Sequence, residues 1–131
     1  MKTLIVEDDF TSRLLLQELL KSYGPLHTAD NGKEAVEAVR FALFKDEPYD
    51  LICLDIMMPE MDGQEALRQI RSLEEDAGIT STNGVKIVMT TALGNVKNVA
   101  AAYRELCDSY LVKPIDKTKL LDELRKLKLI Q

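Results

Sequence analysis

Residues 51–63 read Leu-Ile-Cys-Leu-Asp-Ile-Met-Met-Pro-Glu-Met-Asp-Gly, and the order of residue types here indicates the fold class. It begins with the apolar run Leu51–Leu54, which predicts a buried strand, and Pro48 marks the turn before that strand. Asp62 is a candidate N-cap for a helix over residues 64–74, where apolar residues recur at helical spacing. The stretch therefore predicts a strand that leads through a short loop into a helix.

The same alternation of short apolar runs and amphipathic segments continues along the rest of the chain. It predicts further strands at residues 4–6, 27–29, 85–90 and 109–112, and further helices at residues 10–22, from Asn31 onward, at 95–103 and after Asp116. Strict alternation of this kind is typical of an α/β fold with a parallel sheet and helices on both faces. The strands are apolar on both sides, as that covering requires.

Composition suits one soluble domain with an acidic balance. The chain has 131 residues, of which 46% are hydrophobic and 30% charged, and we expect residues 1–131 to form a single domain with no output domain. A net charge of −5 disfavours direct nucleic-acid binding. The apolar stretch at residues 4–6 is too short for a signal peptide or a membrane span, so we expect a cytoplasmic protein. Cys53 and Cys107 form no CxxC pair and are expected to be reduced and buried.

Polar residues follow four of the predicted strands directly. In an open parallel α/β sheet, ligands bind beyond the carboxyl ends of the strands. Those ends carry carboxylates, hydroxyls and an ammonium group, namely Glu7, Asp8, Asp55, Thr90, Thr91 and Lys113. We therefore expect these side chains to converge at one edge of the sheet. The two threonines compete for one position, and the residues alone leave that choice open.

Three neighbouring carboxylates repel one another, and a divalent cation is the natural compensation. Oxygen donors without a nearby histidine or cysteine favour Mg²⁺ or Mn²⁺ over Zn²⁺. Lys113 would supply a second positive charge. Cation and ammonium together would let an anionic phosphoryl group approach a carboxylate nucleophile.

At these residues the chain resembles the receiver domains of two-component response regulators, particularly the stand-alone, CheY-like regulators of the chemotaxis type. The resemblance extends from Lys2 to the last helix and rests on four motifs in the family's order: Ile5-Val6-Glu7-Asp8, residues 55–63, Thr91-Ala92 and Tyr110-Leu111-Val112-Lys113-Pro114. It implies a flavodoxin-like (βα)5 doubly wound fold with strand order 2-1-3-4-5. Two features depart from the family: Leu106-Cys107 replaces the usual Gly-Ala pair, and the loop at residues 75–84 is longer.

The resemblance also implies roles for the carboxylates. Asp55 would be the phosphoacceptor and a metal ligand. Asp8 would bind Mg²⁺ directly, and Glu7 would act as its partner through a water molecule. Met57 would give its backbone carbonyl to the metal, a role that any side chain tolerates.

Other family roles fall on the later strands. Thr91 would bind the phosphoryl oxygen and take part in the switch, which makes Thr90 a core or ladder residue. Lys113 would pair with the phosphoryl group. Tyr110 would be the aromatic switch residue whose rotamer reports activation, and the peptide bond before Pro114 would be cis.

A receiver of this type works through other proteins. The phosphodonor would be a sensor histidine kinase, a histidine phosphotransfer protein or a small phosphodonor, and a downstream protein would bind the face made by the fourth helix, fifth strand and fifth helix. No nucleic-acid or membrane partner is expected. The output region would include Val96, Val99, Tyr103, Lys117 and Lys119. Apolar residues at Met57 and Leu93, which would flank the hydrolytic water, predict slow self-dephosphorylation.

Three alternative functions compete with this interpretation. A phosphatase of the haloacid-dehalogenase type also uses an Asp nucleophile, but Met57 stands where that family has a second Asp. A flavin binder would need a loop rich in glycine and hydroxyl groups where residues 7–9 are all acidic. A phosphorylation-independent interaction module would leave the complete set of site residues unused. We therefore expect a signalling domain that catalyses only its own phosphorylation and dephosphorylation.

Overall fold

The computed structural model describes residues 1–56, 61–80, 83–92 and 106–131. The described strands form one parallel sheet in the order β2-β1-β3-β4-β5, which confirms the order implied by the resemblance. The strands are β1 (Thr3–Val6), β2 (Leu26–Ala29), β3 (Leu51–Asp55), β4 (Lys86–Thr91) and β5 (Ser109–Val112). Each predicted strand agrees with an observed one to within about one residue, as is usual for element ends.

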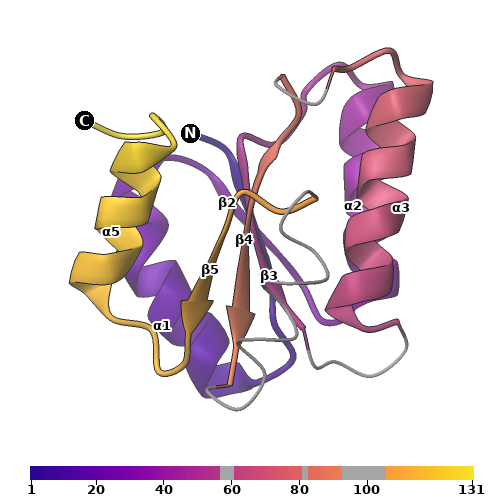
Figure 1. The fold of residues 1–131 in the computed structure, drawn as a ribbon. Coiled ribbons are helices and arrows are strands. Elements are labelled where there is room, and N and C mark those ends of the chain that lie inside the picture. Colours follow the sequence, from indigo (N-terminus) through magenta and orange to yellow (C-terminus); the bar gives the residue numbers. More distant parts are fainter. Residues whose placement is uncertain (57–60, 81–82, 93–105) are drawn as a thin grey trace.

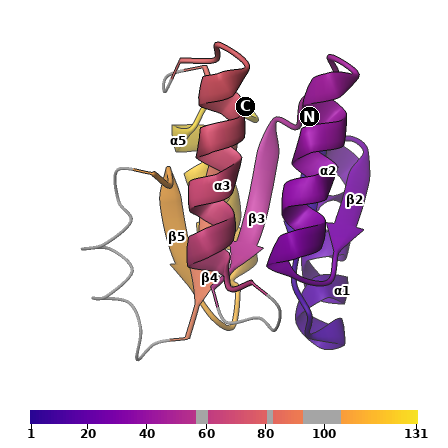
Figure 2. The same cartoon turned by 90° about the vertical axis from the view of Figure 1, so that its right-hand side faces the viewer.

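Helices cover both faces of the sheet. They are α1 (Phe10–Leu20), followed by the 3₁₀ turn η1 (Lys21–Tyr23), α2 (Gly32–Phe44), α3 (Gly63–Asp76) and α5 (Lys117–Lys126). Figure 1 shows α1 and α5 on one side of the sheet and α2 and α3 on the other, and Figure 2 shows α2 and α3 side by side in front of the strands. The helix expected at residues 95–103 lies outside the described part of the chain.

Each described α-helix begins at a side-chain oxygen that accepts a hydrogen bond from a backbone N–H in the first turn. Such caps satisfy donors that have no partner within the helix. The capping residues are Asp9, Asn31, Asp62 and Asp116. They fix where α1 and α3 start, directly beyond the carboxyl ends of β1 and β3.

Alternate residues of the central strands enter two separate cores. Leu4 and Val6 pack with apolar residues of α2 and α3, whereas Ile5 packs with residues of α1 and α5. In β3, Ile52 and Leu54 face the first core and Leu51 and Cys53 the second. Because both faces are covered, these strands are continuous apolar runs, as the sequence indicated.

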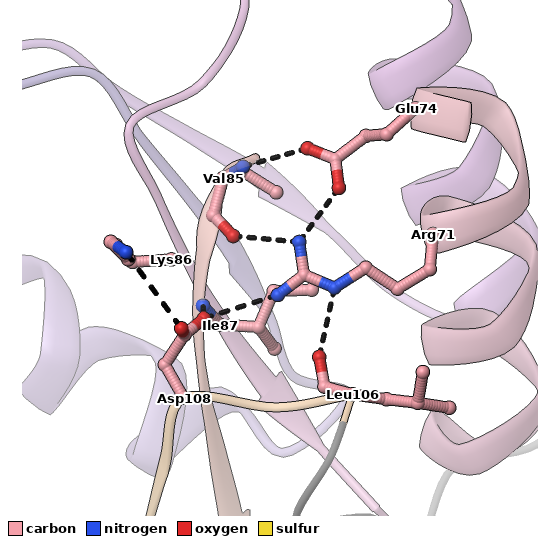
Figure 3. Close-up of polar contacts among 7 residues, drawn as sticks. All are labelled: Arg71, Glu74, Val85, Lys86, Ile87, Leu106 and Asp108. Carbon is pink, nitrogen blue, oxygen red and sulfur yellow. Dashed lines mark hydrogen bonds and ion pairs between the residues drawn. The ribbon is translucent and has the colours of Figure 1, made fainter. Parts of the chain in front are cut away.

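Arg71 of α3 joins that helix to residues just before β4 and β5 (Figure 3). Its guanidinium donates to Leu106 O and Val85 O, both at 2.8 Å, and pairs with Glu74 at 2.7 Å and Asp108 at 3.1 Å. Glu74 is buried and accepts from Val85 N at 2.6 Å. Leu106 departs from the family pattern and lies just before β5. Its carbonyl accepts a hydrogen bond from the Arg71 side chain.

Two expectations need correction. The helix predicted to end at residue 74 continues to Asp76, so the polar loop begins later than expected. Cys53 is buried, but Cys107 is only half-buried; both are unpaired thiols. No helix within the described ranges is long and apolar enough to cross a membrane.

Candidate functional site

The carboxyl ends of β1 and β3 bring three acidic side chains together. Val6 pairs with Leu54 in the register of these strands, so Glu7 and Asp55 follow side by side. One carboxylate oxygen each of Glu7, Asp8 and Asp55 lies within 4.8 Å of the others. Glu7 and Asp55 are buried, at 0% and 4% exposure, whereas Asp8 is exposed. The cluster therefore consists of two buried carboxylates and one, that of Asp8, that is exposed to solvent.

Lys113 reaches this cluster from the end of β5. Its Nζ lies 3.0 Å from Glu7 Oε2 and 3.4 Å from Asp55 Oδ1. Its backbone N–H donates to Thr91 O at 2.8 Å, and the peptide bond to Pro114 is cis. The structure thus brings together residues that are separated by 106 positions in the sequence.

Burial and mutual charge perturb the two groups at the centre of this site. Burial raises the pKa of Glu7; the hydrogen bond from Lys113 opposes this shift, and the charge of Asp55 adds to it. Burial alone would lower the pKa of Lys113, but its hydrogen bond to Glu7 and the charges of Asp55 and Glu7 outweigh burial, so this pKa is raised. The ammonium of Lys113 therefore stays charged beside the carboxylates of Glu7 and Asp55, in a cluster that contains three carboxylates.

The donor atoms of this cluster fit a hard divalent cation. Glu7 Oε2 is buried and makes no hydrogen bond, although it lies in the ion pair with Lys113. All three clustered side chains offer carboxylate oxygens. Exposed Asp8 leaves one side open for the water molecules that Mg²⁺ retains in proteins.

The two threonines at the end of β4 occupy different positions. Both are 1% exposed. Thr90 is the register partner of Asp55, and its carbonyl accepts a hydrogen bond from Ile56 N at 3.2 Å. Thr91 follows it, and its hydroxyl donates to Ala92 O at 3.2 Å. Thr91 therefore lies at the same edge of the sheet as the carboxylates.

The other residues predicted from the sequence lie on β5 and α5 or outside the described part of the chain. Tyr110 lies on β5 and is 37% exposed. Lys117 and Lys119 are exposed at the start of α5. Five residues named from the sequence lie outside the described part of the chain: Met57, Leu93, Val96, Val99 and Tyr103.

Sequence reasoning missed the steric role of Gly63. Its N–H donates to Ile56 O at 2.9 Å, and a Cβ on Gly63 would lie 2.2 Å from Asp55 O. The start of α3 can therefore approach the end of β3 only without a side chain at this position. The Asp62-Gly63 dipeptide was visible in the sequence, but the contact depends on how the loop folds back.

Comparison with known proteins places these features in a family. The model of the response regulator receiver domain matches residues 3–125. Hybrid signal transduction histidine kinase B of Dictyostelium discoideum is 38% identical over 131 residues, 95% of this chain and 6% of that protein. The chemotaxis protein CheY of Bacillus subtilis is 31% identical over 127 residues. The match spans 95% of this chain and 95% of that protein.

Solved structures show the same fold in receiver domains. The receiver domain of the Arabidopsis thaliana histidine kinase CKI1, complexed with Mg²⁺ and BeF₃⁻, has a TM-score of 0.77 and 29% identity, over 97% of this chain and 89% of that one. The receiver domain of Saccharomyces cerevisiae Ssk1, in complex with the histidine phosphotransfer protein Ypd1, has a TM-score of 0.81 and 30% identity, over 97% and 88%.

Proposed function

Because the chain belongs to the response regulator receiver family, whose members are phosphoacceptor signalling switches, we propose that Asp55 is its phosphoacceptor and that the reaction depends on Mg²⁺. One observation carries this proposal. The carboxylates of Glu7, Asp8 and Asp55 gather within 4.8 Å, and Lys113 Nζ lies 3.4 Å from the Asp55 carboxylate. A buried carboxylate beside an ammonium is a suitable nucleophile for an anionic phosphoryl group.

Several residues of the chain would each have a separate role in phosphoryl transfer. An oxygen of the Asp55 carboxylate attacks phosphorus, and the bond from phosphorus to the donor breaks as the leaving group takes the bonding electrons. Lys113 Nζ then pairs with the phosphoryl oxygens, and the Thr91 hydroxyl binds one of them. Asp8, Asp55, the Met57 carbonyl and, through water, Glu7 would hold Mg²⁺. Bound Mg²⁺ would neutralise negative charge on the oxygens around phosphorus.

The partners follow from this chemistry. We propose that a sensor histidine kinase or a histidine phosphotransfer protein supplies the phosphoryl group in the cytoplasm; the relation to a hybrid histidine kinase and to a receiver bound to Ypd1 supports this assignment. The downstream protein would bind near Tyr110 and α5, where Tyr110, Lys117 and Lys119 are exposed. Phosphorylation would bias that face between two arrangements.

The test is labelling by acetyl phosphate in the presence of Mg²⁺. Asp55→Asn replaces the nucleophilic carboxylate with a neutral carboxamide and should abolish the acid-labile label, measured as an added phosphoryl mass on the intact chain. Asp50→Asn is a matched control, because Asp50 is an exposed carboxylate beside the opposite end of the same strand. Full labelling of the Asp55→Asn chain would refute the assignment.

A further inference from the structure

Thr90 carries a buried hydroxyl that has no hydrogen-bond partner. Buried polar groups in proteins are nearly always paired, and an exception needs an explanation. Among the described residues, the buried side-chain oxygens without a hydrogen bond are Thr3 Oγ1, Glu7 Oε2 and Thr90 Oγ1. Glu7 and Thr90 both lie at the edge of the sheet that carries the site.

The register of β3 and β4 places this hydroxyl beside Asp55. Asp55 and Thr90 are Cα partners in neighbouring parallel strands. Side chains at paired positions point to the same face of a sheet, and neighbouring strands lie about 4.8 Å apart. Thr91 is the next residue along the strand, and in this structure its hydroxyl already donates to Ala92 O at 3.2 Å. Thr90 therefore holds an unused donor next to the phosphoacceptor.

A purely structural role does not explain a threonine here. Valine has the same shape and would fill a site that is 1% exposed without burying an unpaired hydroxyl. The neighbouring residues of β4, Val88 and Met89, are apolar and fully buried. In this structure the Thr90 hydroxyl makes no hydrogen bond, and, unlike Thr3, Thr90 is the register partner of Asp55, which points to a use in another state of the site.

We propose that Thr90 is a positioning residue for the phosphoryl-transfer reaction: its hydroxyl donates a hydrogen bond to the Asp55 carboxyl group when Asp55 reacts. Lys113 Nζ contacts both Glu7 and Asp55 in this structure, and it turns to the phosphoryl oxygens when they arrive. The Thr90 hydroxyl then orients the carboxyl group in place of that contact. This inference rests on the proposed role of Asp55.

The test compares Thr90→Val, Thr90→Ser and Thr3→Val. Labelling by acetyl phosphate with Mg²⁺ should be about tenfold slower in Thr90→Val, the cost of losing one hydrogen bond to a charged group, and close to the wild-type rate in Thr90→Ser. The melting temperature of Thr90→Val should equal or exceed that of the wild type. Thr3→Val is the matched control, because Thr3 also buries an unpaired hydroxyl but lies at the start of β1, far from the site. It should keep both the wild-type labelling rate and at least the wild-type melting temperature.

Each other outcome counts against the proposal. Equal labelling rates for wild type and Thr90→Val would overturn the role of Thr90 while leaving Asp55 as acceptor, provided that Asp55→Asn is unlabelled. Slow labelling of both Thr90→Val and Thr90→Ser would show that packing matters and the hydroxyl does not. A melting temperature of Thr90→Val below that of the wild type would show that the hydroxyl stabilises the resting fold. A label on Asp55→Asn would remove the proposed function and this inference together.

Discussion

At the level of single residues, different surroundings give the thiols of Cys53 and Cys107 different reactivities. Burial raises the pKa of the Cys53 thiol to about 12, whereas Cys107 is half-buried and has its pKa raised by burial and by the charge of Asp108. Only the thiolate reacts with alkylating reagents. In the native protein near pH 8 we therefore expect a maleimide to modify Cys107 slowly and Cys53 not at all, as measured by mass spectrometry of peptides over time.

Unfolding and substitution provide the controls for this prediction. In urea both thiols return to ordinary pKa values, and both should react. A Cys107→Ser chain should stay unmodified until it is denatured. Modification of native Cys53 at the rate of Cys107 would show that β3 opens far more readily than its position in the middle of the sheet implies.

Several site residues could be identified from the sequence because strand ends in a parallel sheet share one edge. Asp55 is the last residue of β3, and Glu7 and Lys113 directly follow β1 and β5, so the topology alone brings the three near one another. The sequence could not show that Lys113 Nζ lies closer to Glu7 than to Asp55, at 3.0 Å against 3.4 Å. That pairing depends on side-chain rotamers and burial, which no pattern of residue types encodes.

At the scale of elements, α3 shows why the boundaries differ from the sequence pattern. Residues 74–76 are all acidic, and the sequence pattern assigned residues 75 and 76 to a loop. In the structure Glu74 is 6% exposed, because Arg71 and Val85 N bind its carboxylate and draw the last turn against the sheet. A contact between positions 11 residues apart thus extends the helix beyond the range that local propensity predicts.

The Arg71 cluster should therefore contribute strongly to stability. Arg71→Met would leave the buried Glu74 carboxylate without its cation and would remove the Arg71 donor from Leu106 O and Val85 O. Loss of one partner from a buried ion pair typically costs about 3 kcal/mol, so we expect the free energy of unfolding in urea to fall by about that amount. Arg40→Met on α2 should cost less than about 1 kcal/mol, because its pair with Glu37 is exposed.

A second substitution distinguishes the cost of the unpaired Glu74 charge from the cost of the lost hydrogen bonds to the two carbonyl groups. Glu74→Gln keeps an acceptor for Val85 N but removes the charge. In the Arg71→Met background it should restore part of the lost stability if the stranded carboxylate is the main cause. A double variant no more stable than Arg71→Met would instead place the cost in the lost contacts to the two carbonyl groups.

At the scale of the whole molecule, the proposed metal site exists only while the sheet is intact. Its carboxylates come from β3 and from residues just after β1, and these strands pair side by side only in the folded chain. A cation that binds the native state alone stabilises it by about 2.7 kcal/mol at one hundred times its dissociation constant. Mg²⁺ should therefore raise the melting temperature of the wild-type chain in a concentration-dependent manner.

The rise in melting temperature that Mg²⁺ causes identifies the site, and the melting temperature without Mg²⁺ does not. A chain of net charge −5 gains some stability from any salt, so each measurement needs NaCl at matched ionic strength as a reference. Asp8→Asn removes a proposed direct ligand at an exposed position, so the melting temperature without Mg²⁺ should hardly change while the Mg²⁺-dependent rise shrinks. Asp50→Asn removes the same charge at the opposite end of the sheet and should keep the full rise. If both variants lost the rise equally, Mg²⁺ would be acting through the overall charge of the molecule, and the three carboxylates would not be a metal site.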